Sequence, residues 1–320
     1  MKLKVGNTPM IRIRYSYNGE ERYIYAKLES YNVTGSIKDR VADYIIRKAY
    51  EEGSLKKGMT VVEATSGNTG IALAALGRFY GNYVRIYMPD WASRERVSLM
   101  KMYNAEVILL SREEGGFKQA IKLAKSYAEK NNAFFTNQFE NKYNVLAHYE
   151  GTGKEIVEKL GTEIGGFVSG VGTGGTLMGV AKRIKEVNLD AKIFALEPEK
   201  MPLISQNKII GSHKIEGIGD DFIPKIVNRE MIDEIILIND DDAINMSRKI
   251  AVELGLGVGI SSGANMLASV IAKEGCEKEI VTVFADDNKK YLSTDLSNPI
   301  DLNSTFLSNR VKLLSYEFVP

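Results

Sequence analysis

The sequence has little of the chemistry on which disulfide-bonded and metal-binding proteins depend. Its 320 residues include one cysteine, Cys276, and two histidines, His148 and His213. A single thiol cannot form an internal disulfide, and two histidines far apart in the sequence are too few for a zinc site. We therefore expect no metal, and we expect any catalysis to rely on an organic cofactor.

Two other features are also missing, a large charge of one sign and a long apolar run. The 42 Lys and Arg residues balance 41 Asp and Glu residues to a net charge of +1, which offers no field to attract nucleic acid or anionic lipid. No segment approaches the roughly 20 apolar residues of a membrane span, and residues 1–6 lack the apolar core of a signal peptide. We expect a cytoplasmic protein whose partner is a small molecule.

Alternation of strand-like and helix-like segments predicts an α/β fold. The alternation is typical of βαβ units and of parallel sheets covered on both faces. Because 320 residues exceed the size at which one core usually stops growing, we expect two domains, with a border near residue 145. The final twenty residues or so are expected to form a strand or arm that packs on a partner subunit. The predicted strands are 60–64, 84–88, 106–110 and 134–139, then 167–171, 193–196, 235–238 and 280–284, and a long helix is expected over 143–160.

A glycine turn brings one lysine to the start of an amphipathic helix. The segment 34–40 reads Thr-Gly-Ser-Ile-Lys-Asp-Arg, with the lysine at position 38. The positive end of a helix dipole disfavours an ammonium group, so the pKa of Lys38 should be lowered, as an imine-forming amine requires. A lysine in this position is more often simply solvated, so the neighbouring motifs must decide.

Three further loops join small polar residues to the start of a helix. Residues 63–70 (Glu-Ala-Thr-Ser-Gly-Asn-Thr-Gly) form an anion cradle suited to a carboxylate or a phosphate. Gly172–Thr176 follows a strand and lacks both the P-loop lysine and the dinucleotide spacing, so a monophosphate fits it better. Gly259–Gly263 precedes a helix of small residues, where a plain serine N-cap is an equally good explanation.

In this order and spacing, the four segments resemble the fold-type II pyridoxal-phosphate enzymes, most closely the cysteine synthase (O-acetylserine sulfhydrylase) and cystathionine β-synthase family. The likeness spans nearly the whole chain and includes residues 6–9, 137–144, 213–219 and 291–294. It implies two open, twisted, mostly parallel sheets flanked by helices, as in the tryptophan synthase β-subunit, with pyridoxal 5'-phosphate as cofactor and a homodimer as assembly. The implied domains are a smaller mobile one, 37–145, with the substrate-carboxylate loop, and a larger one, 1–36 and 146–320, with the phosphate loop.

The resemblance also implies a role for each loop residue. Lys38 would form the internal aldimine and later act as general base, Asn68 would bind the ring hydroxyl, and Ser261 would face the pyridine nitrogen. A neutral serine cannot keep that nitrogen protonated, so elimination at the β-carbon is favoured over transamination. The implied phosphate ligands are Gly172, Thr173, Gly174, Gly175 and Thr176, and the implied substrate-binding residues are Thr65, Ser66, Gly67, Thr69, Gln138 and Gly217.

The implied reaction is β-replacement on L-cysteine, L-serine or O-acetyl-L-serine through an aminoacrylate, with sulfide as leaving group or nucleophile. One loop departs from the family, because cysteine synthases usually carry two small residues where this chain has Asp220 and Asp221. A carboxylate repels hydrosulfide but accepts a proton from water. If Asp220 is catalytic, the enzyme would consume cysteine, release hydrogen sulfide and give L-serine. A solvated loop aspartate is an equally good interpretation.

Two other functions stay open at this point. A serine or threonine dehydratase of the same fold would release ammonia and a keto acid. A binding protein without catalysis would use the same pocket to sense a metabolite, although Lys38 argues against it.

Overall fold

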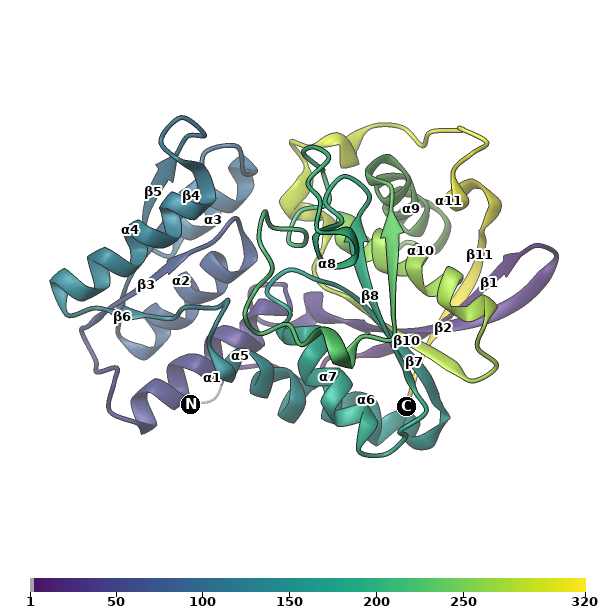
Figure 1. Cartoon of the computed structure of the whole chain (residues 1–320), viewed down its shortest axis with the longest axis horizontal. Coiled ribbons are helices and arrows are strands. Elements are labelled where there is room, and N and C mark those ends of the chain that lie inside the picture. The colour runs from purple at the N-terminus through teal and green to yellow at the C-terminus, as the bar shows by residue number, and fades with distance from the viewer. Residues whose placement is uncertain (1–2) are drawn as a thin grey trace.

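The computed structural model describes residues 3–320 and contains two α/β units, each built on its own sheet (Figure 1). The seven-stranded sheet has the order β11-β1-β2-β10-β7-β8-β9, and the four-stranded sheet has the order β5-β4-β3-β6. Figure 1 shows the four-stranded unit on the left and the seven-stranded unit on the right. The predicted class, two open and mostly parallel sheets flanked by helices, is confirmed.

All neighbouring strands of the four-stranded sheet are parallel, and helices cover both of its faces. Val61 packs in an apolar cluster with α1, α2 and α3, and the next residue, Val62, packs in another with α4. Burial on both faces is the reason these strands read as short, continuous apolar runs. The elements are α1 (Lys38–Glu51), β3 (Thr60–Ala64), α2 (Asn68–Tyr80), β4 (Tyr83–Pro89), α3 (Arg94–Met102), β5 (Glu106–Leu110), α4 (Gly116–Asn131) and β6 (Phe134–Phe135).

The seven-stranded sheet has a parallel centre and an antiparallel edge. Strands β2, β10, β7, β8 and β9 run parallel, while β1 pairs antiparallel with both β2 and β11. Asn18 and Gly19 join β1 to β2 with positive φ angles of 52° and 82°, as a tight hairpin turn requires. The strands are β1 (Met10–Tyr17), β2 (Glu20–Leu28), β7 (Ile164–Gly170), β8 (Lys192–Pro198), β9 (Glu234–Ile238), β10 (Glu279–Phe284) and β11 (Lys312–Phe318).

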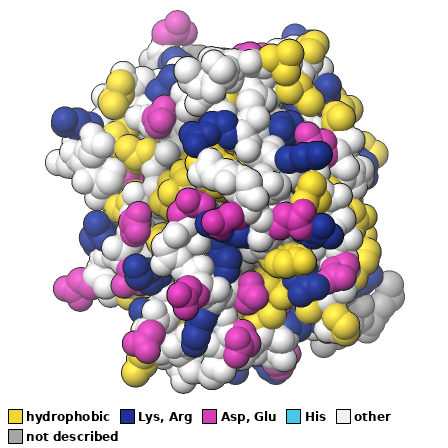
Figure 2. Space-filling model, turned by 90° about the vertical axis from the view of Figure 1, so that its right-hand side faces the viewer, with side chains coloured by type: hydrophobic (Ala, Val, Ile, Leu, Met, Phe, Trp, Pro, Cys, Tyr) yellow, Lys and Arg dark blue, Asp and Glu magenta, His cyan; other side chains and the backbone are white. Residues whose placement is uncertain are grey.

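The helices of the seven-stranded unit lie against both faces of its sheet and bury two large apolar clusters. On the face shown in Figure 2, Lys and Arg side chains alternate with Asp and Glu side chains. No helix among residues 3–320 is both long and apolar enough to cross a bilayer. The helices and helical turns are η1 (Glu29–Tyr31), α5 (Lys142–Ala147), η2 (His148–Gly153), α6 (Lys154–Leu160), η3 (Gly161–Glu163), α7 (Gly175–Lys185), α8 (Leu203–Gln206), η4 (Arg229–Met231), α9 (Asp240–Leu254), α10 (Ile260–Glu274), η5 (Asn288–Tyr291), η6 (Asp295–Ser297) and α11 (Leu307–Arg310).

Most predicted strands are confirmed to within a few residues, and two predictions need correction. The strand predicted over 134–139 ends at Phe135, because the following residues leave the sheet to enter the site. The helix predicted over 143–160 is divided into α5, the π-helical turn η2 and α6. The predicted C-terminal strand is confirmed as β11, which pairs with β1.

Candidate active site

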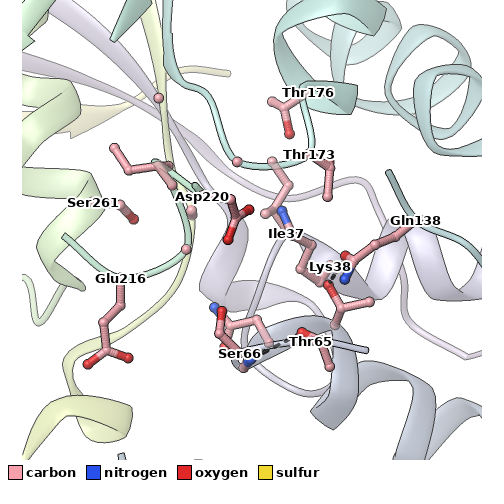
Figure 3. A pocket seen from close by; sticks show the side chains of 18 of the residues that line it. Ile37, Lys38, Thr65, Ser66, Gln138, Thr173, Thr176, Glu216, Asp220 and Ser261 are labelled. Carbon is pink, nitrogen blue, oxygen red and sulfur yellow. Dashed lines mark hydrogen bonds between the residues drawn. The ribbon is translucent and has the colours of Figure 1, made fainter. Parts of the chain in front are cut away.

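A pocket lies where the loops of the two units meet, and nearly all of the predicted site residues line it (Figure 3). The loops that form it follow the carboxyl ends of parallel strands β3 and β7, where ligands of α/β proteins usually bind. Gly175 is the one predicted site residue that does not line this pocket. The predicted residues that line the pocket are Lys38, Thr65, Ser66, Gly67, Asn68, Thr69, Gln138, Gly172, Thr173, Gly174, Thr176, Gly217, Asp220 and Ser261.

Lys38 is the first residue of α1, as predicted. The loop before it is tied to the end of β10, because the Ile37 N–H donates to the Ala285 carbonyl at 2.9 Å. Burial lowers the pKa of the Lys38 amine, while the charges of Asp286 and Asp220 oppose this shift. The amine is therefore poised to be neutral and nucleophilic more easily than an ordinary lysine.

The Gly172–Thr176 loop turns tightly from β7 into α7, and its glycines leave no room for side chains. A Cβ atom on Gly172 would lie 2.3 Å from the Gly217 carbonyl oxygen, and one on Gly175 would lie 2.0 Å from Asn144 Oδ1. Gly174 has a φ of +86°, which glycine adopts without strain. The backbone is thus bare next to a helix N-terminus, which fits a phosphate group. Gly175 faces Asn144 instead of the pocket.

The two threonine hydroxyls of this loop are held by a second layer of side chains. Asn144 Nδ2 donates to Thr173 Oγ1 at 2.9 Å. His148, which is fully buried, contacts Thr176 Oγ1 through Nε2 at 3.2 Å and Thr152 Oγ1 through Nδ1 at 3.0 Å. Burial and the nearby cations Lys38 and Arg40 lower the pKa of His148 well below its usual value, so the ring is neutral. These contacts hold the Thr173 and Thr176 side chains of the loop in place.

The Thr65–Thr69 loop joins β3 to α2 and is linked to Gln138 by hydrogen bonds. Thr69 Oγ1 donates to Gln138 Oε1 at 2.7 Å, and Gln138 Nε2 donates to the Ala64 carbonyl at 2.9 Å. The buried Glu63 carboxyl accepts the Gln138 N–H at 2.9 Å, and burial raises the pKa of Glu63 to about 7. Hydroxyl and amide side chains therefore lie together on one side of the pocket, next to the start of α2, which suits a carboxylate ligand.

Asn68, which lines the pocket, is hydrogen-bonded to Asp286. Asn68 Nδ2 donates to Asp286 Oδ2 at 2.7 Å, and the Tyr291 hydroxyl donates to the same oxygen at 2.8 Å. Asn68 Oδ1 is buried without a hydrogen-bond partner among the described residues. Because buried polar atoms are normally paired, the orphaned oxygen indicates that a polar ligand group belongs here.

Ser261 lies in the first turn of α10 and is buried next to the pocket. The alternative interpretation, a plain serine N-cap, is wrong, because the helix begins at Ile260 and its N-cap is Gly259 without a side-chain capping bond. The neighbouring Ser262 hydroxyl is already paired, because it accepts the Ala285 N–H at 3.1 Å. The Ser261 hydroxyl is therefore available to a ligand.

Asp220 and Asp221 follow Gly219 in the same loop, but their side chains differ in environment. Asp220 lines the pocket, and Figure 3 shows its carboxyl between Ser261 and Lys38. Asp221 forms an exposed ion pair with Lys118 at 3.0 Å. Burial, followed by the charge of Asp221, raises the pKa of Asp220 to about 7, and Lys38 opposes the rise. Asp220 can therefore accept or release a proton near neutral pH.

Two further pocket residues, Arg96 and Glu216, were not predicted from the sequence. Arg96, on α3, is 2% exposed and forms an ion pair with Glu216. The sequence placed Arg96 only on a helical stripe, and it placed Glu216 in a family motif without a role. His213, in the same motif, contacts the Gly219 carbonyl through Nε2 at 2.7 Å and so holds the Asp220 loop.

Comparison with known proteins identifies the class of this site. The family model described as "Pyridoxal-phosphate dependent enzyme" matches residues 1–286, so the chain belongs to the family of pyridoxal-phosphate dependent enzymes. The bare phosphate loop, the orphaned Asn68 oxygen and the buried Lys38 amine all fit pyridoxal 5'-phosphate, which is the cofactor.

Within that class, the relatives are mainly cysteine synthases. Cysteine synthase of Staphylococcus aureus is 43% identical over 295 residues, covering 91% of this chain and 94% of the relative. A probable cysteine synthase of Bacillus subtilis is 40% identical over 300 residues, covering 91% and 95%. The protein is a pyridoxal-phosphate-dependent β-replacement enzyme of the cysteine synthase family.

Solved structures of similar proteins confirm the fold, and one of these proteins has a second activity. A hydrogen sulfide-producing enzyme from Fusobacterium nucleatum is 51% identical with a TM-score of 0.93, covering 97% of this chain and 94% of that chain. Cysteine synthase from Entamoeba histolytica is 38% identical with a TM-score of 0.87, covering 95% and 92%.

Proposed function

We propose that this enzyme consumes L-cysteine, releases hydrogen sulfide and adds water at the β-carbon to give L-serine. The observation that carries the proposal is the carboxyl of Asp220, which lines the Lys38 pocket and has a pKa raised to about 7. A base whose pKa lies near the working pH is well matched to taking a proton from water. Cysteine synthases usually carry a small residue at this point of the loop.

Charge at this position also favours water over sulfide as the nucleophile. When bound, the cofactor supplies the electron sink that allows the α-proton and the β-substituent to leave. The Lys38 amine, with its lowered pKa, takes the α-proton and later returns it. Ionised Asp220 repels the released hydrosulfide and so hinders its return to the β-carbon. A carboxylate oxygen of Asp220 also accepts a proton from the incoming water.

A solved neighbour gives independent support. A second solved structure of the Fusobacterium nucleatum hydrogen sulfide-producing enzyme is of an aspartate-to-asparagine mutant in its lysine-dimethylated form. It contains the α-aminoacrylate intermediate, and it is 50% identical to this chain with a TM-score of 0.93. Identity at this level over nearly the whole chain favours sulfide production here as well.

The remaining site residues have the roles that the family resemblance implies. Lys38 carries the cofactor, Asn68 binds its ring hydroxyl and Ser261 faces its ring nitrogen. The four-stranded unit, residues 37–145, moves as the smaller domain against residues 1–36 and 146–320. The enzyme acts in the cytoplasm as a homodimer. The phosphate ligands are Gly172, Thr173, Gly174, Gly175 and Thr176, and the substrate ligands are Thr65, Ser66, Gly67, Thr69, Gln138 and Gly217.

A second candidate function is the cysteine synthase reaction itself, in which O-acetyl-L-serine is the donor and sulfide the nucleophile. The 43% identity to the Staphylococcus aureus cysteine synthase favours it. A serine or threonine dehydratase is a third function of the same fold, and release of ammonia from serine would distinguish it from both.

Product analysis with separate donors tests these functions. The purified enzyme is incubated with cysteine alone, with O-acetylserine plus sulfide, and with serine alone. We expect cysteine to give equal amounts of sulfide and serine, and we expect Asp220→Asn to lose serine formation by about 100-fold or more while the first turnover still releases sulfide. Asp221→Asn, which changes a carboxyl bound to Lys118, is the matched control. Absence of serine from the wild-type products, or full serine formation by Asp220→Asn, contradicts the proposal.

A further inference from the structure

Arg96 lies at the junction of three parts of the pocket. It belongs to α3 of the four-stranded unit, and its guanidinium pairs with Glu216 on the loop of the seven-stranded unit. The same guanidinium lies 4.7 Å from the centre of the Tyr291 ring. It also fills the space beside the substrate-carboxylate loop, because a Cβ atom on Gly67 would lie 2.7 Å from Arg96 Nε.

The loop that Glu216 begins needs such an anchor. Gly217 and Gly219 have φ angles of +90° and +70°, so the backbone on the way to Asp220 is conformationally permissive. Two anchors come from the seven-stranded unit itself, since the Gly219 N–H donates to the Val171 carbonyl at 2.9 Å and the Gly219 carbonyl contacts His213. The Arg96–Glu216 pair ties the start of this loop to the other unit, and the exposed Asp221–Lys118 pair ties the residue after Asp220 to it.

Arg96 depends on this ion pair more than Glu216 does, because Arg96 is more deeply buried. The Arg96 side chain is 3% exposed and that of Glu216 is 29% exposed, and a buried guanidinium that loses its partner is strongly disfavoured. Movement of the loop would leave the Arg96 guanidinium buried without its partner, so this movement is disfavoured. Glu216 also lines a second, adjoining cavity, together with Gly217 and Asp220, so the pair lies where this cavity meets the Lys38 pocket.

We propose that the Arg96–Glu216 ion pair is a positioning clamp that holds Asp220 in place and thereby decides the fate of the three-carbon enamine left after sulfide departs. This inference rests on the proposed function. With the clamp closed, the oxygen of water bonds to the β-carbon, its proton passes to Asp220, and serine results. With the clamp open, the Lys38 amine takes the place of the enamine nitrogen before water adds, and the enamine leaves the site. In solution it takes up a proton at its β-carbon to become an imine, which water hydrolyses to pyruvate and ammonia.

The ratio of serine to pyruvate formed from cysteine is the measurement that tests the clamp. We expect Glu216→Gln and Arg96→Gln, as holoenzymes, to lower this ratio at least fivefold, and Arg96→Lys to lie between them and the wild type. A merely structural role would reduce total turnover or cofactor content and leave the ratio unchanged. Cofactor absorbance and circular dichroism verify that each variant is folded. If Arg96→Gln fails to fold, Glu216→Gln, at the more exposed partner, still gives the answer.

Glu95→Gln is the matched control. Glu95 bridges the two units one residue before Arg96, accepting the Ser293 N–H at 2.9 Å and the Ser293 hydroxyl at 2.7 Å, but it does not contact the loop of Asp220. We expect its serine-to-pyruvate ratio to equal that of the wild type. The double change Arg96→Gln with Glu216→Gln should be no worse than either single change, because both act through one pair.

The outcomes separate this inference from the proposed function. If the wild type forms serine and Asp220→Asn does not, but Glu216→Gln keeps the wild-type ratio, the clamp is overturned and the function stands. A fall in the ratio for Glu95→Gln as large as for Glu216→Gln also overturns the clamp. If the wild type forms no serine from cysteine, both are overturned.

Discussion

Asp220 and Lys38 lie in one pocket with pKa values shifted in opposite directions. Burial raises the pKa of the Asp220 carboxyl to about 7 and lowers the pKa of the Lys38 amine. Each group reduces the shift of the other, because their charges attract. A carboxyl with a raised pKa and an amine with a lowered pKa can divide the work of one reaction, with Lys38 at the α-carbon and Asp220 at the water.

Serine formation should therefore rise with pH through about 7. Water must lose its proton to ionised Asp220, and the ionised fraction falls about tenfold for each pH unit below the pKa of about 7. The measurement is serine formed per minute at saturating cysteine, over the range from about pH 5.5 to about pH 8.5. A profile that is flat across neutral pH would contradict the role of Asp220.

Asp221→Asn should move this profile without abolishing it. The charge of Asp221 is the second cause, after burial, of the raised pKa of Asp220, so its removal lowers that pKa. The midpoint of the rise in serine formation should move to lower pH, while the maximal rate changes less than about threefold. A shift to higher pH, or a loss of serine comparable with that of Asp220→Asn, would show that the two aspartates have other roles.

Thr69→Val should weaken both substrate binding and the fold. The change keeps the shape of the side chain but removes the 2.7 Å hydrogen bond to Gln138 Oε1, which leaves that buried oxygen unpaired. The loss should cost about 1–3 kcal/mol of unfolding free energy, measured by urea denaturation. The KM for cysteine should rise about tenfold or more, because Gln138 is no longer fixed opposite the substrate carboxylate. An unchanged KM would place the carboxylate elsewhere.

Gly175→Ala should weaken cofactor binding even though Gly175 does not line the pocket. The added Cβ atom would lie 2.0 Å from Asn144 Oδ1, so either Asn144 or the phosphate loop must move. We expect the dissociation constant of pyridoxal 5'-phosphate, titrated into the apoenzyme, to rise about tenfold or more. Gly275→Ala is the control, since nothing lies within 4 Å of a Cβ atom there and its φ is −105°. Equal affinity of both variants would contradict the role of the loop.

The parallel strands and the chemistry of the loops could be predicted because each depends on residues close together in the sequence. Strands buried on both faces read as short apolar runs, and a glycine-rich turn with hydroxyls is informative by itself. No strand was predicted over 10–28, although Ile11, Ile13 and Tyr15 alternate with polar residues before the Asn18-Gly19 turn. Together, the alternation and the turn predict a β-hairpin from the local sequence alone.

The pairs that organise the pocket could not be predicted in the same way. Arg96 meets Glu216, and Asn68 meets Asp286, only after the two units have folded and packed together. Nothing in the local sequence around these residues marks the partner, because the spacing between them is set by tertiary packing. The raised pKa of Asp220 likewise depends on burial, which no single sequence reveals.

The most direct test of the account is to incubate the holoenzyme with cysteine in water enriched in heavy oxygen and to analyse the serine by mass spectrometry. Addition of water at the β-carbon predicts one heavy oxygen in the side-chain hydroxyl of every serine formed, at a rate equal to that of sulfide release, and loss of this product in Asp220→Asn. Sulfide release accompanied only by pyruvate and ammonia, or labelled serine formed equally well by Asp220→Asn, would contradict it.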